Sequence, residues 1–75
     1  MTTLLYKMLL SSAEADRAKS MLSLDLLGNQ AVGIGDHSTE DFYKNAEEAL
    51  RMLIDADERI LILKKQFLKL TQING

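Results

Sequence analysis

Cysteine is absent from this chain of 75 residues, which excludes disulfide bonds and thiolate metal sites. Histidine occurs once, so a zinc site within one chain would need mostly carboxylate ligands, an unusual set for zinc. A chain this short buries only roughly 60% of the surface that it exposes when unfolded, and it is marginally stable without extra support. Since disulfides are excluded and zinc is disfavoured, oligomerisation is the support that the composition leaves.

Proline is also absent, and glycine occurs only at positions 28, 33, 35 and 75. These two residue types are the usual interruptions of helices, so the chain divides into two uninterrupted segments and one connection. We predict a single helical-hairpin domain over residues 1–75, with a helix over about 3–27, a loop over 28–37 and a helix over about 38–71.

No apolar run approaches the ~20 residues that span a bilayer, and no basic residue precedes the short apolar stretch at the start, as a signal peptide would require. The formal net charge is −2, without the basic excess that marks binders of duplex nucleic acid. The lack of cysteine fits a reducing compartment. We therefore expect a cytoplasmic protein that contacts neither a membrane nor duplex nucleic acid.

The second segment carries the strongest pattern, a line of apolar residues whose spacing alternates between four and three. This heptad spacing predicts a helix that packs along its length against another helix. This line, here called the seam, consists of Phe42, Ala46, Ala49, Leu53, Ala56, Ile60, Leu63, Phe67 and Leu70. A second line beside it, here called the outer line, consists of Tyr43, Leu50, Ile54, Leu61 and Leu68. The apolar face is therefore wider than one partner helix requires.

Charge is distributed unevenly along the second segment, with acidic residues early and basic residues late, an order that complements the helix dipole. Ser38 can cap the start of this helix, with Asp41 in the capping-box position. Pairs of opposite charge also occur four residues apart in the stabilising order, with the acid first. These pairs are Glu40–Lys44, Glu47–Arg51 and Asp55–Arg59.

The first segment is helical by propensity but less regular. Between its two apolar ends, the stretch "SSAEADRAKS" is rich in alanine and serine, and small residues there would let another helix approach closely. Gly28 followed by Asn29 predicts the end of this helix. The apolar ends consist of Leu4, Leu5, Met8 and Leu9, and of Met21, Leu22, Leu24, Leu26 and Leu27.

Two helices joined by a short connection form an all-α, antiparallel αα-hairpin. The second helix would be roughly 50 Å long, whereas a compact globule of this chain length has a radius of gyration near ~11 Å. Such an elongated hairpin has no interior of its own, so the outer line must meet another subunit. An antiparallel dimer forming a four-helix bundle is the simplest helical-bundle homo-oligomer, and higher oligomers remain open. A monomeric hairpin is the alternative, but its exposed apolar strip would favour aggregation.

The connection contains the stretch "VGIGDHST", a glycine-containing loop that leads into a helix. Such an arrangement exposes backbone N–H groups and the positive end of the helix dipole, which together can hold a phosphate or a carboxylate. No Lys or Arg lies between Gly28 and Tyr43, so lysines late in the second helix of a neighbouring subunit would supply the positive charge. The predicted ligand-binding residues are Gly33, Ile34, Gly35, Asp36, His37, Ser38, Thr39, Lys64, Lys65 and Lys69.

Three alternatives compete for this loop. It is a plain interhelical turn if Ser38 only caps the helix. It is a metal site if His37, Glu40 and Asp41 share one helical face and meet a symmetry-related set, although metal-binding bundles place such motifs inside the core. A catalytic set of Asp36, His37 and Ser38 is disfavoured, because adjacent residues in a turn rarely align as nucleophile, base and orienting group. We therefore expect neither a cofactor nor enzymatic activity.

The stretch "GIGDHS" between two helices, followed by a helix that contains "DADERI", resembles short uncharacterised helical proteins of bacteriophages, over about residues 32–62. The resemblance implies no chemistry. Many phage proteins of this size inhibit or sequester host components, so it implies a non-enzymatic binder in the host cytoplasm. The favoured hypothesis is a homo-oligomer that sequesters a phosphorylated small molecule, such as a nucleotide-type signal, as an anti-defence protein. The alternative is an inhibitor module that docks on a host protein through its helical surface.

Overall fold

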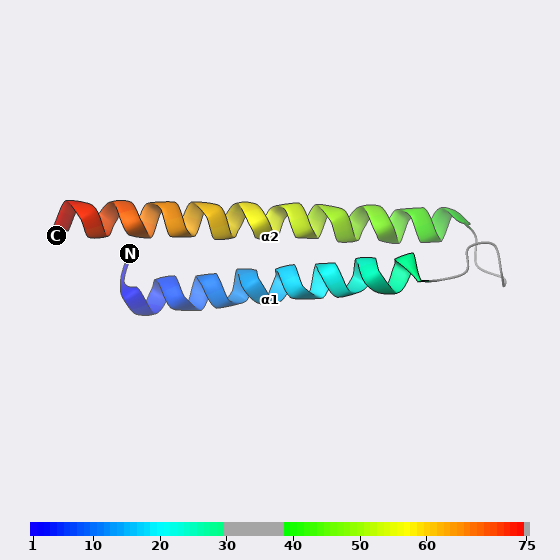
Figure 1. Ribbon diagram of the computed structural model, residues 1–75, viewed down its shortest axis with the longest axis horizontal. Coiled ribbons are helices and arrows are strands. Elements are labelled where there is room, and N and C mark those ends of the chain that lie inside the picture. Colours follow the sequence, from blue (N-terminus) through cyan, green and yellow to red (C-terminus); the bar gives the residue numbers. More distant parts are fainter. Residues whose placement is uncertain (30–38, 75) are drawn as a thin grey trace.

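The computed structural model describes residues 1–29 and 39–74, with side chains described as far as residue 69. Helix α1 (Thr3–Gly28) and helix α2 (Thr39–Asn74) run antiparallel and pack against each other along the length of α1 (Figure 1). The predicted all-α hairpin is therefore confirmed. Helix α2 extends three residues beyond the predicted end at Thr71, as far as Asn74.

The hairpin is a thin rod. Its radius of gyration is 17.2 Å and its extents are 59 × 15 × 14 Å, whereas a compact fold of this length has a radius near ~11 Å. Because the rod is only two helices thick, few side chains can be removed from solvent. Among the described residues, only Ala13, Ser20, Ala49 and Ala56 are buried. The contact between the helices is thus built around small side chains that allow the backbones to approach.

Both ends of α1 are capped by side chains. The Thr2 hydroxyl accepts a hydrogen bond of 3.1 Å from the Leu5 N–H. At the other end, the backbone N–H and the side-chain amide of Asn29 both donate to the carbonyl of Asp25, at 3.2 and 2.9 Å. Asn29 has φ −96°, and Gly28 has no positive φ, so neither of these two residues adopts the left-handed conformation. The predicted stop at Gly28 and Asn29 is confirmed, whereas the Thr2 cap was not predicted.

The seam of α2 faces α1. Every seam residue from Phe42 to Phe67 is buried or half-buried, and Leu70 lies beyond the described side chains. Helix α1 contributes a packing line of its own, whose described members are likewise buried or half-buried. They are Tyr6, Leu10, Ala13, Ser20, Leu24 and Leu27. The heptad prediction for α2 is therefore confirmed, and the packing line of α1 is a new observation.

The apolar ends predicted for α1 lie largely outside this contact. Only Leu24 and Leu27 of that set are half-buried, and the remaining members are exposed. Apolar residues surround α1 instead of forming one stripe, so hydrophobicity alone cannot choose its buried side. The small residues of the middle stretch permit close approach, as expected, and the helix that approaches is α2 of the same chain.

Three contacts set the register of the two helices. The rings of Tyr6 and Phe67 stack with centroids 4.0 Å apart, near the end of the rod that holds both termini (Figure 1). Near the middle, Arg59 contacts Asp16 and Arg17 contacts Asp57. Residues later in α1 therefore contact residues earlier in α2, as antiparallel helices require. This register places Ser20 between the levels of Leu53 and Ala56, where buried small residues let the helices approach each other.

Candidate functional site

Most of the predicted ligand-binding loop lies outside the described residues. Gly33, Ile34, Gly35, Asp36, His37 and Ser38 all belong to the segment 30–38. Thr39 is the first residue of α2 and is exposed. Lys64, Lys65 and Lys69 are also exposed, within two turns of one another on the late part of α2. No observation on the described residues therefore bears on the loop itself.

Within one chain the lysines are far from the start of α2. Thr39 and Lys65 belong to the same straight helix, 26 positions apart, which corresponds to about 39 Å (Figure 1). A ligand bound at Thr39 therefore cannot touch the lysines of its own chain. Only a second chain, oriented in the opposite direction, would bring these residue types together.

The middle of the rod holds a polar cluster centred on Arg59. Its Nη2 donates to Asp16 Oδ2 at 2.6 Å, across the two helices. Its Nε lies 3.0 Å from Asp55 Oδ2, but the N–H does not point at that oxygen, so this contact is an ion pair without a hydrogen bond. The hydrogen bond to Asp16 is the largest effect that raises the pKa of Arg59, opposed by partial desolvation. Arg59 therefore remains a cation throughout the working pH range.

A second ion pair lies on the other flank of the hairpin. Arg17 Nε and Asp57 Oδ1 are 2.7 Å apart, with both side chains about half exposed. Asp57 and Arg59 are two positions apart, so they project about 160° apart around α2. The two ion pairs thus hold α1 from both sides of the seam. Four of these charges, on Asp16, Arg17, Asp57 and Arg59, join the two helices, and their geometry indicates a structural role.

The sequence predicted only part of this network. The pairs Asp55–Arg59 and Glu47–Arg51 are two of the three predicted pairs four residues apart, and both form, at 3.0 and 3.5 Å. The cross-helix partners Asp16 and Arg17 were missed. Their only signal was an acid followed by a base in an otherwise small-residue stretch. That signal becomes informative only when the register of α1 against α2 is known.

Chemistry that needs clustered ligands is not evident over residues 1–29 and 39–69. No group of three or more His, Cys, Asp or Glu side chains that could hold a metal occurs there. The alternatives that involve His37 lie outside the described residues, so neither a metal set nor a catalytic set is tested. Ser20, the buried polar residue, donates its hydroxyl to the Asp16 carbonyl at 2.8 Å and is thereby satisfied within its own helix.

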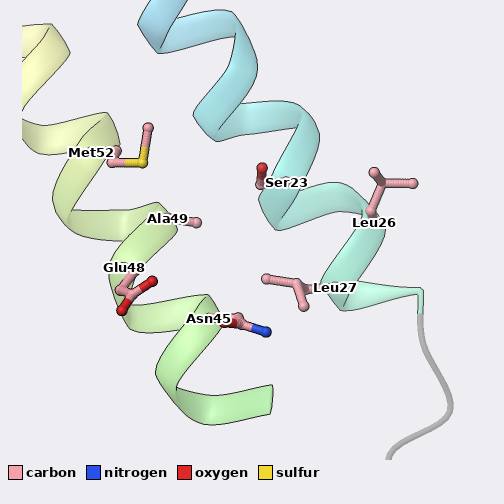
Figure 2. A pocket seen from close by; sticks show the side chains of 7 residues that line it. All are labelled: Ser23, Leu26, Leu27, Asn45, Glu48, Ala49 and Met52. Carbon is pink, nitrogen blue, oxygen red and sulfur yellow. The ribbon is translucent and has the colours of Figure 1, made fainter. Parts of the chain in front are cut away.

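Two open depressions lie on the flank that carries Arg59. The larger, of ≈ 380 Å³, is near the connected end of the hairpin, where Leu27 of α1 points toward Ala49 and Asn45 of α2 (Figure 2). It is lined by Ser23, Leu26, Leu27, Asn45, Glu48, Ala49 and Met52. The smaller, of ≈ 240 Å³, is lined by Leu9, Ser12, Arg59, Ile62 and Leu63. Both are mainly apolar and open to solvent, so they can accept a side chain but cannot exclude water from a reaction.

The outer line occupies the opposite flank of α2. Its members Tyr43, Leu50, Ile54, Leu61 and Leu68 are 49–67% exposed. Leu50 and Met52 are two positions apart and therefore project about 160° apart, which separates the outer line from the depressions. The predicted width of the apolar face is confirmed, since α1 covers the seam and leaves the outer line uncovered in the single chain.

Neither helix, over the part of the chain that the structure describes, is long and apolar enough to cross a membrane. Comparison of the chain with protein-family models, with curated proteins and with solved structures gives no match. The resemblance to bacteriophage proteins therefore stays a prediction. Two surfaces of the rod could receive a partner, the outer line and the depressions.

Proposed function

We propose that this chain is a non-enzymatic, homo-oligomeric binding protein whose copies associate through the outer line of α2. The observation that supports the proposal is the exposure of Leu50, Ile54 and Leu61, at 49–67%, on the same helix whose seam is already covered. A contiguous apolar strip on a thin soluble rod is a common mark of an interface. The proposal makes the hairpin one half of a larger bundle.

The energies make such an association feasible. Fully burying a leucine or isoleucine contributes about 1.5–3 kcal/mol, so covering a half-exposed one contributes about 1 kcal/mol. Two copies of the outer line would then supply about 10 kcal/mol, comparable to the estimated 4–15 kcal/mol that association costs in lost freedom. Contacts beside the line must therefore decide the affinity and the orientation.

As the bound ligand we propose a phosphorylated small molecule, such as a nucleotide-type signal, at the start of α2. The N-terminus of this long helix carries a partial positive charge, and Thr39 there is exposed and has a hydroxyl group. Glu40 and Asp41 disfavour an anion there. Binding therefore requires the basic part of a second chain, with Lys64, Lys65 and Lys69, beside this site. Sequestration of such a signal would suit an anti-defence role.

Calorimetric titration tests the ligand part of the proposal. The oligomeric protein is titrated with mononucleotides, dinucleotides and cyclic oligonucleotides, and we expect saturable binding of at least one. A Lys65→Ala, Lys69→Ala double variant, measured at a concentration at which native mass spectrometry shows it to be oligomeric, should bind the same ligand at least tenfold more weakly. If no member of the panel binds to a verified oligomer, the ligand assignment is wrong and the association through the outer line is unaffected.

A second candidate is an interaction module that docks on a host protein, and the larger depression favours it. Leu26, Leu27 and Met52 form an apolar lining that an apolar side chain of a partner could fill (Figure 2). Affinity capture with purified candidate partners distinguishes this function. Met52→Lys should abolish capture if the depression is the docking site, whereas binding that survives Met52→Lys but is lost with Thr39→Ala would assign recognition to the start of α2.

A further inference from the structure

We infer that α2 of one chain packs antiparallel on α2 of a second copy, centred between Asp55 and Ala56, so that Leu50 of each copy lies opposite Leu61 of the other. This arrangement rests on the proposed homo-oligomeric function and specifies its partner, direction and register. Three observations support it: the spacing of the outer line, the charges beside it and the neutralisation of Asp57.

The spacing of the outer line is self-complementary. Tyr43 and Leu68 are equally distant from the point between positions 55 and 56, and Leu50 and Leu61 are equally distant from the same point. A two-fold axis through that point therefore places each apolar residue opposite another apolar residue, with Ile54 of both copies beside the axis. Such a match of a surface with itself is what a symmetric dimer interface requires. All these side chains are about half exposed or more in the single chain.

The charges along the solvent side of the outer line select the antiparallel direction. At about 100° per residue, six charged residues follow this side: Glu40, Glu47, Arg51, Glu58, Lys65 and Lys69. The same two-fold axis places this side of α2 in one copy next to the same side of α2 in the other copy. Each acid then lies almost level with a base of the other copy. The offset between them along the helix axis is at most about 3 Å, well within the reach of these long side chains. The opposed pairs are Glu47 with Lys65, Arg51 with Glu58, and Glu40 with Lys69.

A parallel arrangement would bring like charges together. In register, it sets Glu47 beside Glu47 and Lys65 beside Lys65, because acidic residues come early in α2 and basic residues come late. Repulsion between like charges across the interface therefore disfavours the parallel dimer. The Glu47–Arg51 pair within one chain does not compete strongly, since it is 3.5 Å long and both side chains are about two-thirds exposed.

The inner side of the outer line is also compatible with the axis. The antiparallel arrangement brings the two copies of Asp57 near each other, since this residue lies close to the centre. Arg17 of the same chain already neutralises Asp57 at a distance of 2.7 Å. The ion pair between α1 and α2 thus removes a repulsion that would otherwise oppose the dimer.

Cysteine cross-linking tests the arrangement without background, because the chain has no cysteine of its own. In the antiparallel dimer, the two copies of position 50 are about 16 Å apart, beyond the reach of a disulfide, whereas position 50 of one copy faces position 61 of the other. We expect oxidation of Leu50→Cys alone to give no covalent dimer. An equimolar mixture of Leu50→Cys and Leu61→Cys should give a covalent dimer whose linked peptides join the two positions.

The outcomes separate this inference from the proposed function. Cross-linking of Leu50→Cys alone would establish a parallel pair and overturn the inference. Absence of any cross-link in a sample that native mass spectrometry shows to be oligomeric would move the interface to another face, again overturning only the inference. A monomeric wild-type chain at micromolar concentration would overturn both.

A charge exchange gives an independent test. Glu47→Lys and Lys65→Glu should each weaken the dimer about tenfold, because each replaces two attractive pairs per dimer by two repulsive ones. Combining both changes in one chain should restore an affinity within about threefold of wild type. Glu48→Lys is the matched control, since it makes the same change one position away on the depression flank, and it should leave the dimer unchanged. Failure of the double variant to recover would contradict the pairing.

Discussion

Arg59 of α2 and Asp16 of α1 are joined by a hydrogen bond of 2.6 Å across the hairpin, although 43 positions separate them in the chain. The bond connects the middle of one helix to the middle of the other, at a level where the packed side chains are small. It therefore restrains sliding of the two helices, which alanine and serine contacts alone restrain weakly. Arg59 also forms an ion pair with Asp55, so one guanidinium group neutralises two carboxylates.

We predict that Asp16→Ala lowers the Tm by a few degrees, and that Asp16→Asn lowers it less, because the amide oxygen still accepts from Arg59. A double-mutant cycle of Asp16→Ala with Arg59→Ala, measured by thermal unfolding, should give a clear coupling between the two positions. The control cycle uses Glu47 and Arg51, whose exposed side chains lie 3.5 Å apart and should couple more weakly. Equal coupling in both cycles would contradict the special role of Asp16.

The charge of Arg59 should make no pH-dependent contribution in the neutral range. The hydrogen bond to Asp16 raises its pKa above the ordinary arginine value, so the stability that it contributes is fully present below that ordinary value and is lost only as the pH rises through the higher folded pKa. The difference in unfolding free energy between wild type and Arg59→Gln should therefore stay constant between about pH 6 and 9. Denaturant titrations at several pH values measure this difference, and a steady trend across the range would show that another group is coupled to Arg59.

The buried alanines should resist enlargement. Ala56→Leu forces a larger side chain between the helices at a position with 0% exposure, and it should lower the free energy of unfolding by about 1–3 kcal/mol. Ala15→Leu is the control, because Ala15 is exposed on α1 and leucine is a good helix former. Urea denaturation compares the two. A similar loss for both variants would mean that the register of the helices differs from the one described.

The stacked rings of Tyr6 and Phe67 should stabilise the end of the rod through their faces. Tyr6→Ala removes the stack and should cost about 1–2 kcal/mol, less than for a fully buried aromatic, since both rings are only half-buried. Tyr6→Phe keeps the ring and should change stability by less than about 0.5 kcal/mol. Chemical denaturation followed by circular dichroism distinguishes them, and a large loss for Tyr6→Phe would assign the contribution to the hydroxyl group.

The outer line should control oligomerisation. Leu50→Lys places a charge in the proposed interface and should shift the protein to monomers in sedimentation equilibrium at micromolar concentration. Met52→Lys is closely matched, because Met52 is 48% exposed against 49% for Leu50, but it projects to the opposite flank. It should therefore leave the oligomer intact. The reverse result would locate the interface on the depression flank.

Much of α2 could be predicted from the sequence because its information is local. The alternation of four and three residues along the seam is a property of one helix, and it specifies which side is buried whatever partner is present. The stop at Gly28 and Asn29 is equally local, since Asn29 caps the carbonyl of Asp25 four residues earlier. Neither feature requires knowledge of a distant part of the chain.

The buried side of α1 could not be predicted in the same way. Leu4, Met8 and Leu22 are as apolar as the residues that face α2, yet they are exposed. A helix with apolar residues around its circumference has several possible buried faces of similar hydrophobicity. The pairing of Asp16 with Arg59 could not be predicted for a related reason, since it depends on the register of one helix against the other.

The sequence by itself determined that the chain forms two helices, that α2 buries its seam and that the outer line is left over, because periodicity and capping act over a few residues. Only the tertiary structure decided which side of α1 meets α2, which small residues lie between the helices and which charges join them. These depend on the register of the two helices. The ion pairs that join them connect residues 40 and 43 positions apart, and a pattern that acts over a few residues cannot specify such a pairing.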